Sequence, residues 1–496
     1  MINWKVRYAR ILEKFPELFD RNVSLLEVGS GDRGIAQYLK RPVTGLEPQF
    51  GQERDPWLVP VNGSIFEIPF GDRSFDTVLC IDVFEHLPRE DRVRAMKELT
   101  RVAARQVLVS CPCDPFAMDA ERQLAQTFQR STGNVPQWLA EHLSNGLPGV
   151  GDMLAAIAQT GHPFTVEGNE GLMQHFGGIF LDYFFPIASS FQQIHERKGT
   201  VHAPLAAGAS DLYYSYLFTI DVAMRAAAEP GTAPLPAALA PGTPPEGSLK
   251  VFAVSHKSIE PGSTGWITPI FAGPAADEAP ANALTDILPN GERLLNSRWS
   301  ELSAMYRVWR EGPVAEAVGF CHYRRYLNFG SSTLAPREVN IRKSNLRASI
   351  SVRPDDASLA ALRDGAILTA PPIVFPFPVW IQYNLFHHPD DWCRILGMLS
   401  RRYPHLIASA LAHFESKELY ANNLFVMRWD CFDELCRLWF DVLREFEALV
   451  PASRGSSYQN RDVSFLAERV FDIWLRYRIS QGTPCRTFPI FYVEDA

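Results

Sequence analysis

Short apolar runs alternate with amphipathic segments along the first part of the chain. Four of these runs are apolar enough for buried strands, near residues 24–28, 43–47, 76–81 and 107–111. Between the last two, residues 92–104 have apolar side chains at the spacing of a helix with one buried face: Val93, Met96, Leu99 and Val102. Strands that alternate with helices predict a parallel sheet with helices on both faces, the doubly wound α/β class.

A stretch rich in proline, alanine and glycine interrupts this pattern at residues 229–247. Proline breaks helices and is excluded from central strands, so we expect an extended, semi-rigid linker. An apolar strand follows at residues 249–256, and an amphipathic helix at 300–309 precedes another strand at 318–327. The pattern predicts a first domain over residues 1–228 and a second over 248–496.

Composition excludes several classes of protein. At 496 residues the chain exceeds what one hydrophobic core usually supports. Its net charge of −8 gives no basic footprint for nucleic acid. We find no 18-residue apolar run and no secretory signal, so neither a membrane span nor export is expected. Eight cysteines without paired metal spacing indicate reduced thiols and a cytoplasmic protein.

A glycine-rich turn after the first strand is the strongest candidate for a cofactor site. The strand carries Glu27 and leads into Gly29-Ser30-Gly31-Asp32-Arg33-Gly34. Glycines let the backbone pass close to a ligand at the carboxyl end of a strand. The second strand ends at Glu47, where a carboxylate can accept both hydroxyls of a ribose. Because the same letters match the Gly-x-Gly-x-x-Gly of dehydrogenases, the turn alone leaves the cofactor open.

Residues further along the chain indicate which cofactor this turn binds. Pro69-Phe70, then Ser74-Phe75-Asp76-Thr77-Val78, then Glu85-His86-Leu87 follow in order. With the glycine turn, they resemble class I S-adenosylmethionine-dependent methyltransferases over about residues 20–115. The resemblance implies S-adenosylmethionine as cofactor and a Rossmann-like sheet with a helical cap. It also implies which residues contact the cofactor: Glu27, Gly29 and Gly31 at the methionine part, Glu47 at the ribose, and Ser64 and Ile65 at the adenine, where the family often has Asp.

Two histidines are candidates for activating the methyl acceptor. Methyl transfer to oxygen needs a base for the hydroxyl proton, and imidazole suits this near neutral pH. His86 follows the strand at 76–81. His142 lies in Glu141-His142-x-x-x-Gly146-Leu147-Pro148, a pattern similar to methyltransferases of bacterial polysaccharide gene clusters. Each could instead be a hydrogen-bonded structural histidine. No Asn/Asp-Pro-Pro-Tyr motif for a nucleobase amine is present, which favours oxygen as the acceptor.

The second domain has its own ordered motifs. They are His322-Tyr323-Arg324-Arg325-Tyr326, then His387-His388-Pro389-Asp390-Asp391, then Asn422-Asn423, and last a helix that contains Glu468. This set resembles the domain-of-unknown-function family 4422 over about residues 250–477, whose members look like glycosyltransferases of capsule and O-antigen loci. The resemblance implies an α/β domain of the glycosyltransferase-A kind with a nucleotide-sugar donor.

Side-chain chemistry supports a donor site at the strand end. Guanidinium groups bind phosphate oxygens in bidentate geometry without a metal, and the strand presents His322, Arg324 and Arg325 in place of Asp-x-Asp. We therefore predict no metal here. If the strand continues, Arg324 and Arg325 point to opposite faces. Lys257 and His388 are further donor-site candidates, although an exposed lysine at a strand end is often only solvated.

A carboxylate is expected to accept the proton of the sugar acceptor. Asp391 is the first candidate, although Pro389-Asp390-Asp391 also suits the start of a helix. Asn423 and Glu468 are weaker candidates, by resemblance only.

These features together indicate a bifunctional enzyme of bacterial surface polysaccharide biosynthesis. It would methylate a sugar hydroxyl and transfer a sugar to a glycan or lipid-linked saccharide, with any membrane association at the inner membrane surface through that acceptor alone. Two alternatives stay open at this point. The second domain could only bind glycan, or the chain could be a small-molecule methyltransferase with a degenerate partner domain.

Overall fold

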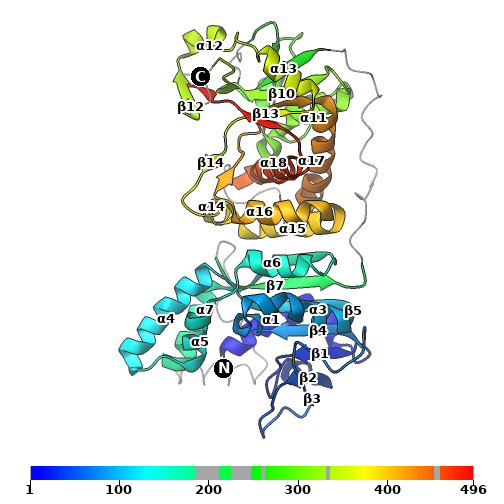
Figure 1. Cartoon of the computed structure of the whole chain (residues 1–496), viewed down its shortest axis with the longest axis vertical. Helices are drawn as coiled ribbons and strands as arrows, with labels where there is room; N and C mark the ends of the chain where they lie inside the picture. The colour runs from blue at the N-terminus through cyan, green and yellow to red at the C-terminus, as the bar shows by residue number, and fades with distance from the viewer. Residues whose placement is uncertain are drawn as a thin grey trace. The chain divides into compact units, whose positions relative to one another are not determined.

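The computed structural model describes residues 2–184, 212–224, 247–257, 263–330, 336–451 and 459–494. Contacts divide the chain into two compact units (Figure 1). One unit holds Met1–Pro230 with His388–Leu411, and the other holds Gly231–His387 with Ala412–Ala496. Apart from Gly247, the predicted linker at 229–247 lies outside the described residues, so its conformation stays a prediction.

A seven-stranded sheet forms the centre of the first unit, in the order β3-β2-β1-β4-β5-β7-β6. Its strands are β1 (Leu25–Val28), β2 (Val43–Glu47), β3 (Leu58–Asn62), β4 (Phe75–Ile81), β5 (Ala103–Pro112), β6 (Phe164–Gly171) and β7 (Tyr213–Asp221). Strands β1 to β5 are parallel, whereas β7 runs antiparallel to β5 and β6. The order reverses between β1 and β4, which leaves a crevice at the carboxyl ends of the strands. The predicted doubly wound sheet is confirmed.

Helices cover the sheet because its central strands are apolar on both faces. In β4, five consecutive residues from Thr77 to Ile81 are buried. Helix α3 (Arg92–Val102) packs against β4 and β5 through its apolar stripe, as predicted. It ends at Val102 because Ala103 already begins β5. Helices α1 (Ile2–Lys14) and α2 (Ala36–Leu39) share a separate core with β1, β2 and β4.

The described residues between 115 and 224, where the sequence places the cap, form strands as well as helices. Helices α4 (Phe116–Thr132), α5 (Gln137–Asn145) and α7 (Leu172–Phe184) pack together through Leu124, Phe128, Leu139 and Ile179. Helix α6 (Val150–Ala158) packs on α3 instead, and β6 and β7 extend the main sheet. The region therefore completes the sheet as well as supplying a helical cap.

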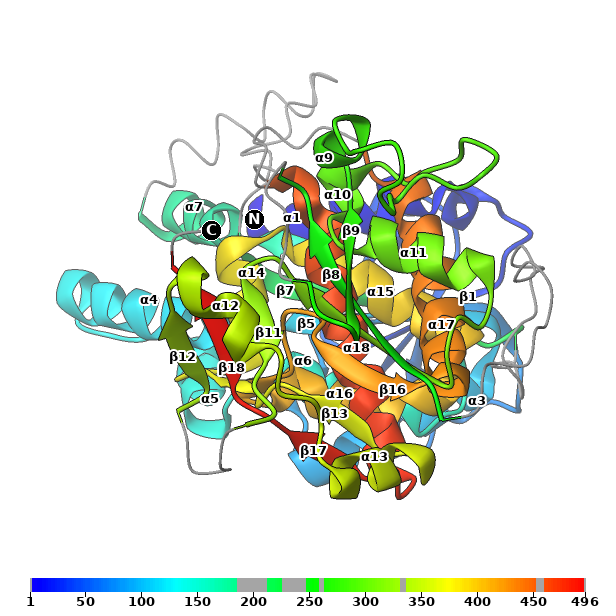
Figure 2. The same cartoon turned by 90° about the horizontal axis from the view of Figure 1, so that it is seen from above.

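The second unit contains a nine-stranded mixed sheet (Figure 2). Its main path runs β12-β18-β11-β10-β16-β13-β17, and β8 pairs with β10 and β9. The strands are β8 (Leu249–Ser255), β9 (Ile267–Phe271), β10 (Ala317–His322), β11 (Arg325–Leu327), β12 (Glu338–Ile341), β13 (Ile367–Thr369), β16 (Phe425–Arg428), β17 (Cys485–Thr487) and β18 (Ile490–Val493). The predicted α/β class is confirmed here too.

Aromatic side chains fill the core between this sheet and its helices. Helix α17 (Trp429–Leu449) packs against β10, β16 and α18 (Asp462–Ser480). Phe425 of β16 has its ring centroid 5.7 Å from Phe320 of β10 and 5.5 Å from Phe471 of α18. Such ring contacts add to the burial that holds strand and helix together.

One predicted strand is in fact a hairpin. The sequence pattern suggests a single strand over residues 318–327. Instead β10 ends at His322, Tyr323 and Arg324 form a two-residue turn, and β11 begins at Arg325, which pairs with His322. The strand does not continue through Arg324 and Arg325, so the condition under which they would point to opposite faces is not met.

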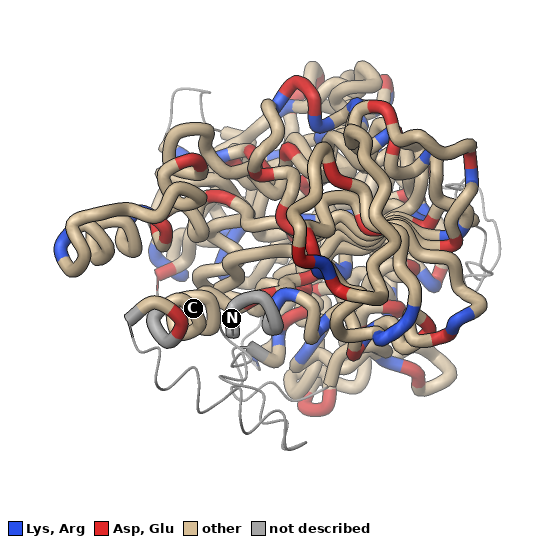
Figure 3. Tube along the Cα trace, turned by 90° about the horizontal axis from the view of Figure 1, so that it is seen from below, with Lys and Arg blue, Asp and Glu red and all other residues tan. Residues whose placement is uncertain are grey.

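Helix α15 (Pro389–Arg402) belongs to the first unit and packs on β6. The Ser400 hydroxyl donates to the Phe164 carbonyl at 2.8 Å and accepts from the Phe164 amide at 3.1 Å. Among the residues described, none of the helices combines the length and apolar character needed to cross a bilayer. Acidic and basic residues are interspersed along the trace in Figure 3.

Candidate functional site

The glycine turn after β1 has a backbone that only glycine adopts easily. Gly29, Gly31 and Gly34 have φ angles of +78°, +56° and +50°. A Cβ on Gly29 would lie 2.1 Å from Val83 Cγ2, and one on Gly34 would lie 2.1 Å from Glu27 Oε2. The turn therefore requires glycine for both conformation and space.

Two carboxylates, the buried Glu27 and the partly buried Glu47, hold this turn. Glu27 accepts from the Ile35 amide at 2.6 Å and from the Tyr8 hydroxyl at 2.8 Å. Burial raises the pKa of Glu27 to about 7, although both donors oppose that shift. Glu47, at the end of β2, accepts from the Gly31 amide at 2.6 Å. The structure thus brings the predicted cofactor residues Glu27, Gly29, Gly31 and Glu47 together, and their contact with a cofactor stays a prediction.

The two predicted adenine contacts follow β3 at the same edge of the sheet. The Ser64 hydroxyl is exposed and accepts from the Phe66 amide at 3.2 Å. Ile65 is buried. Sheet order places this loop beside the end of β2, where Glu47 lies, because β2 and β3 are parallel. The order β3-β2-β1 therefore sets Ser64 and Ile65, Glu47, and the glycine turn side by side.

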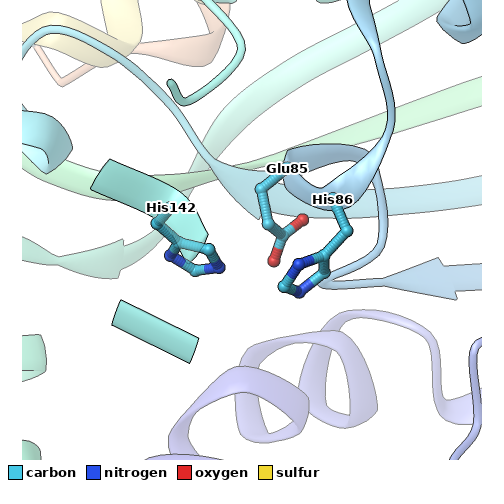
Figure 4. A group of neighbouring side chains, drawn as sticks. All are labelled: Glu85, His86 and His142. Atoms are coloured by element: carbon cyan, nitrogen blue, oxygen red, sulfur yellow. The ribbon is translucent and has the colours of Figure 1, made fainter. Parts of the chain in front are cut away.

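A cavity of about 310 Å³ opens beside Gly29. It brings the predicted histidines together, with the His86 and His142 ring centroids 5.0 Å apart (Figure 4). His86 ends the 3₁₀ turn Phe84–His86 after β4, and His142 lies on α5. Other side chains that line the cavity are Arg7, Tyr8, Asp82, Glu85, Trp138, Tyr183 and Tyr214.

His142 is held by a buried carboxylate. Its Nδ1 lies 2.8 Å from Glu121 Oε1, which also accepts from the Tyr214 hydroxyl at 2.6 Å. Its Nε2 is buried and has no hydrogen-bond partner among the described residues. When Nδ1–H donates to Glu121, the lone pair of Nε2 is left available. Glu121 was not anticipated, because nothing in the sequence around it suggests a role.

His86 is an exposed residue on the wall of the cavity. Burial, and then the nearby His142, lower the pKa of its imidazole. Its Nδ1 lies 4.0 Å from Glu141 Oε2. A lowered pKa keeps the ring neutral at pH 7, so that it can accept a proton or bind a cation.

Glu85 completes a group that could hold a metal ion. Its carboxylate is buried, which raises its pKa well above the ordinary value, and Asp82 adds to that shift. The ligand atoms of Glu85, His86 and His142 all lie within 4.8 Å of one another. Glu85 directly precedes His86 in the Glu-His-Leu motif, so a signal for it was present in the sequence but was not used.

The cavity wall also carries a partly buried ion pair. Asp82, directly after β4, pairs with Arg7 of α1. Burial opposes the charge on Arg7, but the surrounding acids, Asp82 foremost, raise the pKa of its guanidinium overall. The ordinary cost of burying these groups is thereby reduced by their pairing.

The second unit has a larger cavity, of about 700 Å³, at the end of β10. It brings together the predicted donor residues His322, Arg324 and Arg325. The two guanidinium carbons lie 5.0 and 5.3 Å from the ring centroid of Tyr492, so both arginines stand at one aromatic ring. Lys257 Nζ lies 5.5 Å from the ring centroid of Tyr323, another residue of the cavity wall.

Carboxylates line the same cavity. Glu301 accepts from Asn423 Nδ2 at 2.8 Å, and Glu468 accepts from the Asn422 amide at 2.9 Å. Asn422 and Asn423 have φ angles of +74° and +47°, a strained backbone that recurs at functional sites. Burial raises the pKa of Glu468, with Arg469 opposing. Glu301 was not anticipated, because it reads as the start of an ordinary helix.

Asp391 and His388 are not among the residues that line this cavity. Asp391 is buried in the first turn of α15, where it accepts from Arg394 Nη1 at 3.0 Å. Both residues belong to the first unit. The structure therefore does not group them with His322, Arg324 and Arg325.

Comparisons with known proteins match the two halves separately. The family described as "Methyltransferase domain" matches residues 26–110, and the "Domain of unknown function (DUF4422)" matches residues 250–479. Among curated proteins, none matches the chain in sequence.

Several solved structures are similar to parts of the chain. The bifunctional glycosyltransferase WbbM is 21% identical with a TM-score of 0.45, over 50% of this chain and 46% of that one, so the match spans about half of WbbM. A putative sarcosine dimethylglycine methyltransferase from Galdieria sulphuraria is 15% identical with a TM-score of 0.27, over 43% and 83% of the two chains. The magnesium protoporphyrin IX methyltransferase of Synechocystis PCC 6803, solved with bound SAH, is 13% identical with a TM-score of 0.26, over 44% and 82%.

The family matches agree with the fold and the glycine turn of the first unit and with the α/β sheet of the second. The chain therefore carries a methyltransferase domain in its N-terminal region and a DUF4422 domain in its C-terminal region.

Proposed function

We propose that this protein is a bifunctional enzyme of bacterial surface polysaccharide biosynthesis. It transfers a methyl group from S-adenosylmethionine to a sugar hydroxyl, and a sugar from a nucleotide-sugar to a glycan or lipid-linked saccharide. The main support is the first cavity, which has the cofactor turn at Gly29 on one side and two imidazoles on the other. We place these reactions in the cytoplasm, at the inner membrane surface when the acceptor is lipid-linked.

The residues of the first unit fit S-adenosylmethionine. The glycines allow a positive-φ turn in which a Cβ on Gly29 or Gly34 would clash with Val83 or Glu27, and Glu47 can accept ribose hydroxyls with the oxygen that Gly31 does not use. The bound cofactor supplies a methyl group on a positively charged sulfur.

His86 and His142 activate the acceptor hydroxyl in this proposal. The hydroxyl oxygen bonds to the methyl carbon while the carbon–sulfur bond breaks, and the hydroxyl proton leaves through the imidazole side of the cavity. Glu121 fixes the ring of His142, so its Nε2 faces the reaction without reorienting.

The second cavity supports glycosyl transfer. Arg324 and Arg325 can neutralise the departing nucleoside diphosphate, with His322 and Lys257 beside them. Glu301 or Glu468 can accept the proton of the sugar acceptor, since both carboxylates line the cavity. Asp391 stays a prediction from sequence. Sugar transfer by the Glu468→Gln and Asp391→Asn variants shows which of these two carboxylates accepts the proton. Loss of transfer in the first variant alone identifies the carboxylate on the cavity wall.

The cofactor assignment is tested by calorimetry of S-adenosylmethionine binding to the full chain. Glu47→Ala removes the ribose acceptor and is expected to weaken binding by about 1.5–3 kcal/mol, the worth of hydrogen bonds to a charged group. Glu53→Ala serves as control, since Glu53 is an exposed acid in the loop after β2. Unchanged affinity in Glu47→Ala, or tighter binding of a nicotinamide dinucleotide, contradicts the proposal.

Both activities are tested with the full chain, labelled S-adenosylmethionine, labelled nucleotide-sugars and surface glycan as acceptor. Label from both donors is expected in the glycan. Methyl label alone, with tight binding of the finished glycan, indicates a second domain that only binds. Methyl label on small molecules alone indicates a small-molecule methyltransferase.

A further inference from the structure

Three side chains of the first cavity present electron pairs to one point. Figure 4 shows the Glu85 carboxylate between the imidazoles of His86 and His142. Their ligand atoms lie within 4.8 Å of one another, a spacing that a small adjustment brings into the range of one metal ion. They come from two elements that pack together, the 3₁₀ turn after β4 and helix α5.

Two polar atoms of these residues are buried without a hydrogen-bond partner among the described residues. Among the described residues, neither Glu85 Oε2 nor His142 Nε2 has a donor, and the two residues are only 2% and 5% exposed. A buried acceptor left unpaired is destabilising, so a site built this way indicates a missing positive partner.

Four of the side chains that line the cavity donate to other acceptors. Arg7 pairs with Asp82, and the hydroxyls of Tyr8 and Tyr214 donate to Glu27 and Glu121. Trp138 Nε1 donates to the Tyr183 hydroxyl at 3.2 Å. The contacts of these four side chains leave Glu85 and His142 facing the cavity as acceptors.

A second contact prepares His142 as a ligand. A carboxylate that accepts from the far ring nitrogen fixes the tautomer and raises the basicity of the other nitrogen, as in many metal sites. Glu121 makes this contact with Nδ1 at 2.8 Å, and the Tyr214 hydroxyl fixes Glu121 in turn.

We propose that Glu85, His86 and His142 bind one divalent transition-metal ion, such as Zn²⁺, Mn²⁺ or Co²⁺, which holds the methyl acceptor. Two imidazoles and one carboxylate suit these ions better than Mg²⁺, which prefers oxygen ligands alone. Three protein ligands leave coordination positions open. Those positions would take hydroxyl oxygens, and two of them suit a sugar with neighbouring hydroxyl groups.

The proposal rests on the proposed methyl transfer and changes how the histidines serve it, as ligands instead of bases. The ion lowers the pKa of a bound hydroxyl, so that the O–H bond breaks and its proton passes to water at the open side near His86. The oxygen then bonds to the methyl carbon as the carbon–sulfur bond breaks. One proton and S-adenosylhomocysteine are released for each methyl group transferred.

Cobalt titration tests the site directly. The full chain, freed of tags and treated with chelator, is titrated with Co²⁺, whose visible absorption reports its ligands. One ion per chain is expected. His142→Ala and Glu85→Gln should each weaken binding at least 100-fold, and Glu121→Gln should weaken it 10- to 100-fold because it acts through His142. His162→Ala is the matched control, since His162 lies two residues before β6 and does not line the cavity.

S-Adenosylmethionine affinity and the unfolding temperature of each variant show whether it is folded. Folded variants that still bind one Co²⁺ with unchanged affinity and spectrum overturn the proposal, as does a parent chain that binds no Co²⁺ at millimolar concentration. Methyl transfer that persists in the chelated enzyme also overturns it, while leaving the proposed function with a histidine base. Failure to bind S-adenosylmethionine at all counts against the proposed function instead.

Discussion

Gly29 and Gly34 are positions where one added methyl group would block the cofactor turn. Both have positive φ, and both approach a side chain that fixes the turn, Val83 for Gly29 and Glu27 for Gly34. The close approach follows from the switch in strand order, which requires the backbone after β1 to bend sharply beside the chain after β4. At each of these two positions, both the positive φ and the close neighbouring side chain therefore disfavour any residue larger than glycine.

Gly29→Ala is expected to abolish measurable S-adenosylmethionine binding, because its Cβ would lie 2.1 Å from Val83 Cγ2. Gly161→Ala is the control, since Gly161 also has positive φ, at +74°, but no atom within 4 Å of its Cβ. The control should lose about 1–2 kcal/mol of stability through backbone strain and keep its affinity. Calorimetry and thermal unfolding measure both. Equal affinities in the two variants would show that Gly29 does not shape the cofactor site.

His387 makes stability depend on pH. It follows α14 (Val379–Phe386), its ring centroid is 4.2 Å from that of Phe465, and burial, with help from Arg469, lowers its pKa to about 3. The unfolded chain binds a proton near pH 6.5 and the folded chain does not. Stability is therefore full above pH 6.5 and falls as the pH drops towards 3.

His387→Phe should remove this dependence and keep an aromatic ring against Phe465. Between pH 7 and pH 4 the parent should lose on the order of 3 kcal/mol more than the variant, at 1.36 kcal/mol for each pKa unit. Urea unfolding at both pH values measures the difference. Parallel losses in parent and variant would mean that His387 is protonated in the folded protein.

At the scale of elements, the β10–β11 hairpin determines which charged side chains line the second cavity. A continuous strand would send Arg324 and Arg325 to opposite faces. The two-residue turn at Tyr323 and Arg324 instead keeps both arginines at the cavity wall and near Tyr492 of β18. A turn of this kind depends on which strands pair, and β18 comes more than 160 residues later in the chain.

Replacing Arg324 and Arg325 with lysine tests whether a guanidinium fork is needed. The charge is retained, but an ammonium cannot form two parallel hydrogen bonds to a phosphate. We expect affinity for a nucleoside diphosphate to fall at least tenfold by calorimetry, and further when both are alanine. Arg342→Lys with Arg347→Lys, two exposed arginines outside the cavity, should leave it unchanged. Equal affinity in all variants would remove the phosphate role.

At the scale of the whole molecule, the two compact units do not follow the order of the chain. Residues His388–Leu411 group with the first unit, although they lie far beyond the proline-rich stretch. Helix α15 covers β6, and Ser400 makes two hydrogen bonds to the backbone of Phe164. The first unit therefore needs residues from both halves of the sequence.

Limited proteolysis should cut between Ala228 and Ser248, where proline, alanine and glycine predominate. The nicked protein should still bind S-adenosylmethionine with parent affinity. A separate fragment of residues 1–228 should unfold at lower temperature than the nicked protein, because it lacks α15. Equal unfolding temperatures would mean that α15 contributes nothing to the first unit, and loss of binding on nicking would place the linker in the site.

Local patterns determined much of the first unit by themselves. The apolar runs, the glycine turn and Glu47 are each encoded within a few residues, because strand burial and positive φ impose local requirements. His86 and His142 could also be proposed as site residues from the sequence, because each lies in a short motif.

Tertiary structure alone decided which residues meet. Glu121 reaches His142 from another helix, Glu301 reaches Asn423 across more than 120 residues, and Asp391 groups with the first unit while Arg324 and Arg325 belong to the second. Such contacts arise from the packing of distant elements, and spacing along the chain carries no record of them. The sequence therefore specified the chemical groups, and the fold selected which of them share a cavity.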